Sequence, residues 1–215
     1  MIPLYHDFSD ETVVVFGGGP VGARKARRFD REASVVVISP EFPEDEYGDA
    51  ELVRAAPEGT RISEWFERTA PALAVAATDD AAVNAAVERE ARRRGALVNR
   101  ADHSGERDVG SVVVPATVRD RDLTVSISTG GASPALAKEL RRRIEREIDG
   151  AGELAAITAD IRAELKARGV DPTHRRRAVR KAVRSSEVWK DLGTGESNPR
   201  QTVDAVVDSA LGENS

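Results

Sequence analysis

Three glycines near the start of the chain have the spacing of a phosphate-binding turn. Gly17, Gly19 and Gly22 form a G-x-G-x-x-G pattern between an apolar run at 13–16 and a segment with helical character. In such a turn the first glycine makes the bend, the second lets a diphosphate approach the backbone, and the third lets the helix pack on the strand. The pattern predicts a dinucleotide site that also includes Pro20 and Val21. The alternative is an ordinary glycine turn, which the strand–turn–helix context disfavours.

Two polar residues follow expected strands, at the edge of a parallel sheet where ligands bind. Glu41 follows the expected strand at 34–39, and it either holds the ribose hydroxyls of the dinucleotide or begins a solvated loop. No arginine directly follows this strand to hold a 2′-phosphate, so the sequence favours NAD over NADP. Thr78 follows the expected strand at 72–77, where it either hydrogen-bonds the cofactor or, like Asp79, caps the next helix.

Asp102 is the candidate for acid–base chemistry. It lies just past the expected strand at 96–99, at the same edge of the predicted sheet. A carboxylate there is suited to accept a proton from a substrate that transfers a hydride to a nicotinamide. The alternative is that Asp102 only caps its loop by accepting a hydrogen bond from a backbone N–H.

A second glycine turn occurs later in the chain. Gly130 and Gly131 precede an expected helix for which Ser133 is the N-cap and Pro134 the first helical residue. Backbone N–H groups exposed at such a turn are suited to hold an anion or a carboxylate. Packing between two copies of the chain is the alternative role for the glycine pair.

The elements that must position these residues alternate between strand and helix over the first half of the chain. This order predicts an α/β fold with a doubly wound parallel sheet of the Rossmann type. The expected strands are 12–16, 34–39, 72–77 and 96–99, with helices at 20–31 and 80–94 and a strand-like piece with a turn of helix at 61–66.

The pattern changes beyond residue 110. Two strands, an antiparallel pair, are followed by helices only, and the expected ranges are strands 111–116 and 122–128 and helices 134–147, 152–168, 172–191 and 201–211. We therefore expect a Rossmann domain over 1–110, a small α+β domain over 111–150, and a helical region over 151–215. Residues 193–200 are rich in glycine, serine, asparagine and proline, which predicts a mobile tail.

Composition excludes several classes of protein. The 215-residue chain has no cysteine, which excludes disulfides, thiolate catalysis, Fe–S clusters and cysteine-based zinc sites. A net charge of −5 disfavours general nucleic-acid binding. No apolar run approaches the ~20 residues needed to cross a bilayer. Residues 1–7 do not resemble a secretion signal, so we expect no membrane contact and a cytoplasmic location.

Histidines and a basic run complete the list of candidates. His6, His103 and His174 are too dispersed to predict a metal site, and His103 beside Asp102 is either a loop residue or a ligand to a bound iron. The basic run at 174–184 has no interleaved aromatic residues. It is either a solvated helix face or a surface that attracts a polyanion.

Five sequence blocks together resemble the precorrin-2 dehydrogenase/sirohydrochlorin ferrochelatase family. This family forms the amino-terminal module of sirohaem synthase and also occurs as stand-alone proteins, whose length the chain resembles. The blocks follow the order of the family over about residues 2–148, and they are Gly17–Arg27, Ala76–Asp80 with Val83 and Asn84, Val98–Asp102, Val113–Ala116 and Ser128–Pro134.

The resemblance implies a function and a set of site residues. Members are homodimers with a central dimerisation domain, here 111–150, and they oxidise precorrin-2 to sirohydrochlorin with NAD; some also insert iron. The resemblance assigns Glu41 and Phe42 to the adenosine end of the cofactor, and Asp102 to dehydrogenation and to chelation. The expected contacts with the eight carboxylates of the tetrapyrrole are Ser128, Thr129, Gly130 and Gly131, and Arg100, Arg107, Arg119 and Arg121 are either further contacts or solvated charges.

Two other functions remain open at this point. The first is an NAD-sensing regulatory module of the kind attached to ion channels, which the second domain and its S-T-G-G-x-S-P turn disfavour. The second is a tetrapyrrole metal chelatase without dehydrogenase activity, which the intact glycine pattern disfavours.

Overall fold

A computed structural model describes residues 2–44, 46–102, 111–194 and 198–212. The chain divides into two compact units. The first consists of residues 1–114 with 130–132, and the second of residues 115–129 with 133–215. Among the described residues, no helix combines the length and the apolar character that crossing a membrane requires.

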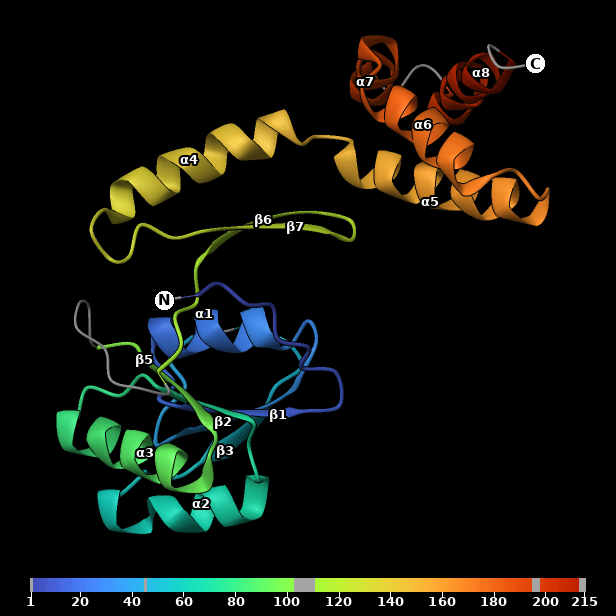
Figure 1. Ribbon diagram of the computed structural model, residues 1–215. Helices are drawn as coiled ribbons and strands as arrows, with labels where there is room; N and C mark the ends of the chain where they lie inside the picture. Colours follow the sequence, from blue (N-terminus) through green and yellow to red (C-terminus); the bar gives the residue numbers. More distant parts are fainter. Residues whose placement is uncertain (1, 45, 103–110, 195–197, 213–215) are drawn as a thin grey trace. The chain divides into compact units, whose positions relative to one another are not determined.

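The first unit is a five-stranded parallel sheet with helices on both faces (Figure 1). The strand order is β3-β2-β1-β4-β5, so the chain leaves the central strand β1 in one direction and later returns to its other side. The elements are β1 (Thr12–Phe16), α1 (Pro20–Phe29), β2 (Ser34–Ser39), β3 (Glu51–Arg54), η1 (Gly59–Arg61), α2 (Ile62–Thr69), β4 (Leu73–Ala76), α3 (Ala81–Arg94) and β5 (Leu97–Arg100). The predicted doubly wound sheet of the Rossmann type is confirmed.

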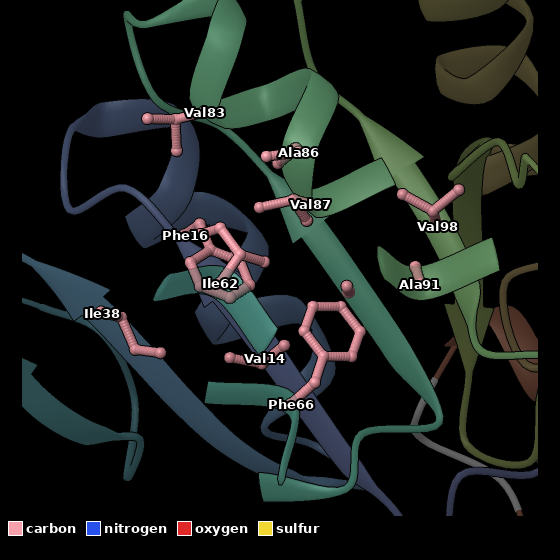
Figure 2. Close-up of a cluster of buried hydrophobic side chains, with 12 residues drawn as sticks. Val14, Phe16, Ile38, Ile62, Phe66, Val83, Ala86, Val87, Ala91 and Val98 are labelled. Carbon is pink, nitrogen blue, oxygen red and sulfur yellow. The ribbon is translucent and has the colours of Figure 1, made fainter. Parts of the chain in front are cut away.

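Two apolar layers hold this sheet between its helices. Alternate residues of β1 face opposite sides, so Val13 and Val15 pack toward α1 while Val14 and Phe16 pack toward α2 and α3. On the second side the Phe16 and Phe66 rings stack with centroids 6.1 Å apart (Figure 2). Because strands buried on both faces carry almost no polar residues, the runs at 13–16 and 35–38 are apolar throughout.

In its described residues, the second unit is a hairpin followed by five helices. Its elements are β6 (Ala116–Asp120), β7 (Leu123–Ile127), α4 (Pro134–Glu147), α5 (Ala151–Ala167), α6 (Pro172–Val183), α7 (Ser186–Thr194) and α8 (Pro199–Gly212). The last four helices share an apolar core, which includes Leu154, Ile161, Leu165, Val188 and Val203.

The start of α5 packs closely against the end of β6. The Gly152 N–H donates a hydrogen bond of 2.8 Å to the Asp120 carboxylate. A Cβ atom on Gly152 would lie 2.1 Å from the Asp120 carbonyl oxygen, closer than any real contact. Glycine is therefore required at position 152 for the helix to approach the hairpin.

Several expected boundaries are wrong. The strand expected at 111–116 begins only at Ala116, because the first residues of that range pair alongside β5 instead: Ser111 forms a parallel bridge with Val98, and the Val112 N–H donates to the Val98 carbonyl at 2.8 Å. Residues 61–66 belong to η1 and α2, so the expected turn of helix is present there but the strand-like piece is not. The helix expected at 172–191 is broken between α6 and α7, and the edge strand β3 was not expected. Of the predicted mobile tail, residues 195–197 lie outside the described residues.

Candidate functional site

The glycine turn after β1 combines two tightly packed positions with an open one. Gly17 has a φ of +112°, and a Cβ there would lie 2.3 Å from the Ala77 carbonyl oxygen. A Cβ on Gly22 would lie 1.9 Å from the Gly17 carbonyl oxygen. A Cβ on Gly19 would meet no atom within 4 Å. The first and third glycines are thus required by packing, whereas the second borders open space where a diphosphate can approach.

The N-terminus of α1 opens from this turn. Gly19 is its N-cap without a side-chain cap, and Pro20 occupies the first helical position. The first intrahelical hydrogen bond runs from the Ala23 N–H to the Gly19 carbonyl at 3.0 Å. The N–H groups of Val21 and Gly22 precede that bond, so they belong to the helix end that attracts anions. The Val21 side chain at the same turn is 37% exposed.

The loop after β2 lies against the glycine turn. A Cβ on Gly18 would be 2.4 Å from the Glu41 carbonyl oxygen, and the buried Tyr47 hydroxyl donates a hydrogen bond to the Gly18 carbonyl. Phe42 packs edge-on against Tyr47, with ring centroids 5.5 Å apart. The structure therefore places Glu41 and Phe42 close to the glycine turn.

An arginine that was not predicted from the sequence also reaches this loop. Arg54, at the carboxyl end of β3, pairs in register with Ser39 of β2. Its guanidinium donates to the Pro40 carbonyl at 3.1 Å and lies 5.5 Å from the centre of the Phe42 ring. No arginine follows β2 directly, but strand pairing places one beside its end. The only signal for it was the edge strand β3, which was not predicted.

Thr78 belongs to a local network at the end of β4. Its hydroxyl donates to Asn84 Oδ1 at 2.8 Å, and Asn84 Nδ2 donates to the Thr78 carbonyl at 2.8 Å. The cap of α3 is neither Thr78 nor Asp79 but Asp80, which accepts from the Ala82 N–H at 2.8 Å. Asn84 is 1% exposed and was not among the predicted site residues. Its position six residues after Thr78, one turn into a helix, was the available signal.

At the end of β5, Arg100 and Asp102 form a two-point ion pair. Arg100 Nε donates to Asp102 Oδ1 at 2.8 Å, and Arg100 Nη2 donates to Asp102 Oδ2 at 2.7 Å. Arg100 Nη1 also donates to Glu88 of α3 at 2.8 Å. The Arg100 side chain is 7% exposed and that of Asp102 is 27% exposed. Arg100 is therefore occupied by two carboxylates, while Asp102 remains partly accessible.

The ion pair controls the ionisation of Asp102. Hydrogen bonds from Arg100, with a smaller contribution from Asn84, lower the pKa of Asp102 from 3.8 to about 2, against the opposing effect of burial. The same bonds raise the pKa of Arg100. Asp102 is therefore a carboxylate throughout the neutral pH range.

Asn99 supplies an unused acceptor on the same strand. It is 3% exposed, and its Nδ2 donates to the Val112 carbonyl at 2.8 Å. Its Oδ1 accepts no hydrogen bond from the part of the chain that the structure describes. A buried acceptor without a partner costs free energy, so this oxygen is a destabilising feature of the strand as described.

The second glycine turn lies at the start of α4. The Thr129 hydroxyl donates to the Ser133 carbonyl at 3.1 Å and accepts from the Ser133 N–H at 3.2 Å. Gly130 and Gly131 have φ angles of +65° and +90°, and a Cβ on either would meet no atom within 4 Å. Ser133 caps α4, as expected, by accepting from the Leu136 N–H at 3.2 Å. His103 and Arg107 lie outside the described residues.

No group of three or more histidine, aspartate or glutamate side chains suited to a metal ion occurs among the residues that the structure describes.

Comparison with known families decides the assignment. Residues 4–116 match the family described as "Putative NAD(P)-binding", and residues 120–147 match the one described as "Sirohaem biosynthesis protein central". The chain belongs to the precorrin-2 dehydrogenase/sirohaem synthase N-terminal module family. The resemblance stated from the five sequence blocks is thereby confirmed, and the first unit is its NAD(P)-binding domain. The open space at Gly19 and the first-turn N–H groups of α1 fit a dinucleotide diphosphate.

Individual members of this family show how far the similarity extends. A precorrin-2 dehydrogenase from Methanosarcina barkeri (strain Fusaro / DSM 804) is 29% identical over 217 residues, which are 98% of this chain and 95% of the relative. A sirohaem synthase from Stutzerimonas stutzeri (strain A1501) is 37% identical over 180 residues, which are 81% of this chain and 37% of the relative. The chain thus spans about a third of the length of the sirohaem synthases that it matches.

A solved structure has the same fold. The protein named SirC, precorrin-2 dehydrogenase, is 20% identical in sequence and superposes with a TM-score of 0.72 over 97% of this chain and 100% of its own.

Proposed function

We propose that the protein oxidises precorrin-2 to sirohydrochlorin with NAD. The observation that carries the proposal is that the glycine turn and the Asp102 carboxylate lie at the carboxyl edge of one parallel sheet, where such sheets bind ligands. The balanced reaction is precorrin-2 + NAD⁺ → sirohydrochlorin + NADH + H⁺. Bound NAD supplies the hydride acceptor. The names of the M. barkeri relative and of SirC support this choice of substrate.

One group of residues is proposed to hold the cofactor, and another to accept the proton. The N–H groups at Val21 and Gly22 hold the diphosphate, with Gly19 giving it room. The Asp102 carboxylate accepts the proton that leaves the macrocycle. With a pKa of about 2, Asp102 then releases that proton to water rather than keeping it. Arg100 orients the Asp102 carboxylate instead of binding a substrate carboxylate, because its guanidinium N–H groups already donate to Asp102 and Glu88.

The turn at Ser128–Gly131 remains the proposed contact for substrate carboxylates. A Cβ on Gly130 or Gly131 would meet no atom within 4 Å, and Thr129 fixes the shape of the turn through its two hydrogen bonds with Ser133. A carboxylate is the kind of group that such a turn accepts.

The direct test of the proposed function is turnover. Enzymatically prepared precorrin-2 is mixed with NAD and the protein, and the appearance of NADH is followed together with the absorbance of the macrocycle. Formation of one NADH per sirohydrochlorin supports the proposal, and no NADH above a protein-free control contradicts it. A second stage adds Fe²⁺ or Co²⁺, and a further protein-dependent absorbance change would extend the function to metal insertion, in which Asp102 accepts pyrrole N–H protons.

We expect NAD to bind more tightly than NADP, because Glu41 is the residue proposed to hold the ribose and its charge would repel a 2′-phosphate. The guanidinium of Arg54 lies beside the same loop, so we expect it to reduce the difference between the NAD and NADP affinities. Replacing Arg54 with alanine is therefore expected to weaken NADP binding more than NAD binding. Titration calorimetry with both cofactors measures this. Equal affinity of the unmodified protein for NAD and NADP would remove the preference.

We further propose that the protein is a homodimer held through the hairpin and α4. Val118 is buried, but the other apolar residues of β6 and β7 are only half-buried, and α4 has no buried residue at all. Leu136 on α4 is 51% exposed. A two-stranded hairpin with one amphipathic helix has little stability of its own, so a second copy is needed to complete this core.

Light scattering is expected to show twice the chain mass of 23.2 kDa at micromolar concentration. Replacing Leu136 with aspartate is expected to shift the mass toward one chain, because it places a charge in the proposed interface. The matched control is Leu52→Asp, which changes an exposed apolar residue of the edge strand β3 by the same charge. A single-chain mass for the unmodified protein would contradict the homodimer.

A further inference from the structure

Five arginines surround a cavity in the second unit that the proposed reaction does not use. The cavity has a volume of about 320 Å³ and lies between α5 and α6. We call it the arginine groove, and its lining residues are Arg162, Arg175, Arg176, Val179, Arg180, Val183 and Arg184.

Helical spacing explains how the groove forms. On α6 and the residue that follows it, Arg176, Arg180 and Arg184 recur every fourth position and make a row roughly 12 Å long. Arg175, Val179 and Val183 make a second row beside it, at the same spacing. Arg162 lines the groove from α5. The result is an apolar strip of two valines bordered by guanidinium groups from both helices.

The charges of the groove have no partners within the described chain. Arg121 and Arg200 of the same unit are paired with Glu153 and Glu164, whereas none of the five groove arginines forms an ion pair with a described carboxylate. Val183 is 41% exposed in their midst. In a chain whose net charge is −5, this is a local concentration of positive charge around exposed apolar surface. Such a surface attracts an anion that also offers an apolar face.

We propose that the arginine groove binds a polycarboxylate tetrapyrrole, with the valine strip against the macrocycle and the arginines on its peripheral carboxylates. The choice of this ligand rests on the proposed function, whose substrate and product both have a flat ring edged with carboxylates. A single-stranded nucleic acid fits less well, because no aromatic side chain lines the groove to stack on bases. A small inorganic anion would leave the valine strip uncovered.

The test measures binding to the full chain without turnover. An octacarboxylate porphyrin, uroporphyrin, is titrated with protein and followed by its fluorescence, at low and at high KCl. The unmodified protein is expected to bind it at two classes of site, the arginine groove and the crevice at the sheet edge. The double variant Arg176→Glu/Arg180→Glu is expected to weaken one class by at least ~10-fold, because two attractions become repulsions. High KCl is expected to weaken the same class.

A matched variant separates a local effect from a general one. Arg68→Glu/Arg89→Glu makes the same change of charge at two exposed arginines of the first unit, and we expect it to leave both classes unchanged. Unaltered binding by the groove variant, or an equal loss in the matched variant, would overturn the proposal. So would an unlabelled single-stranded oligonucleotide that displaces the porphyrin from this class at lower concentration.

The outcome is independent of the dehydrogenase assay. If precorrin-2 is not oxidised but porphyrin binding requires Arg176 and Arg180, the proposed function fails and the polycarboxylate site stands. If precorrin-2 is oxidised and the groove variant binds porphyrin normally, only the groove proposal fails. Circular dichroism of the groove variant checks that its helices are intact.

Discussion

Replacing Gly19 with aspartate is expected to abolish NAD binding while leaving the protein folded. A side chain at this position meets no protein atom within 4 Å, so the fold can accept it. The added carboxylate would occupy the space proposed for the diphosphate and would repel its charge at the N-terminus of α1. Titration calorimetry measures the binding, and thermal unfolding measures the stability.

Two further variants separate charge, volume and fold in this experiment. Gly19→Asn has nearly the same volume without the charge, and we expect it to retain more NAD binding than the aspartate. Gly22→Ala is expected to lose stability instead, because its Cβ would lie 1.9 Å from the Gly17 carbonyl oxygen. Unimpaired NAD binding by Gly19→Asp would mean that the diphosphate does not lie at this turn.

The second large effect is expected at Asp102. Asp102→Asn keeps the size of the side chain and removes the carboxylate that is proposed to accept the substrate proton. We expect turnover to fall by at least ~10²-fold, the lower end of what acid–base catalysis contributes. Binding of NAD should be unchanged. The rate of steady-state precorrin-2 oxidation measures turnover, and titration calorimetry measures NAD binding.

The second carboxylate that Arg100 binds provides the control. Glu88→Gln alters the other carboxylate bound to Arg100, and it leaves the two hydrogen bonds between Arg100 and Asp102 in place. We expect its effect on turnover to be much smaller. Near-normal turnover in Asp102→Asn would remove this residue from the mechanism and leave hydride transfer to positioning alone.

The pH dependence follows from the direction of the pKa shift. The pKa of Asp102 is lowered in the folded protein to about 2, below its ordinary value of 3.8. The stability that its ion pair contributes is therefore complete above about pH 4 and is lost as the pH falls through about 2. Turnover should accordingly show no decline due to protonation of Asp102 at any pH above about 4.

The sheet could be predicted from the sequence because its strands are buried on both faces. A half-exposed strand alternates apolar and polar residues, whereas a strand buried on both faces is apolar throughout, as Val13–Phe16 is. A glycine turn directly follows this first run. The edge strand β3 escaped prediction because three of its four residues are exposed, among them Glu51 and Arg54. The run at Val112–Val114 was mistaken for a hairpin strand, since apolar character does not reveal which neighbour a segment pairs with.

Single candidate residues could be selected from the sequence by their type and position. Interactions between side chains could not. Glycine spacing identified the turn at Gly17, and position after a strand identified Asp102. The two-point hydrogen bonding between Arg100 and Asp102 could not be foreseen, because it depends on side-chain rotation after β5. The same holds for Arg54, which reaches the loop after β2 only through strand pairing.

The joint between Asp120 and Gly152 limits how this protein can be cut or fused. A truncation or a fusion point near residue 150 would remove the N–H partner of the Asp120 carboxylate and the helix that packs on the end of the hairpin. The linker between α4 and α5 is therefore not a module boundary, although it lies between two helices. A chimaeric protein that exchanges the carboxyl-terminal helices for those of a relative would need to carry β6 and β7 along with them.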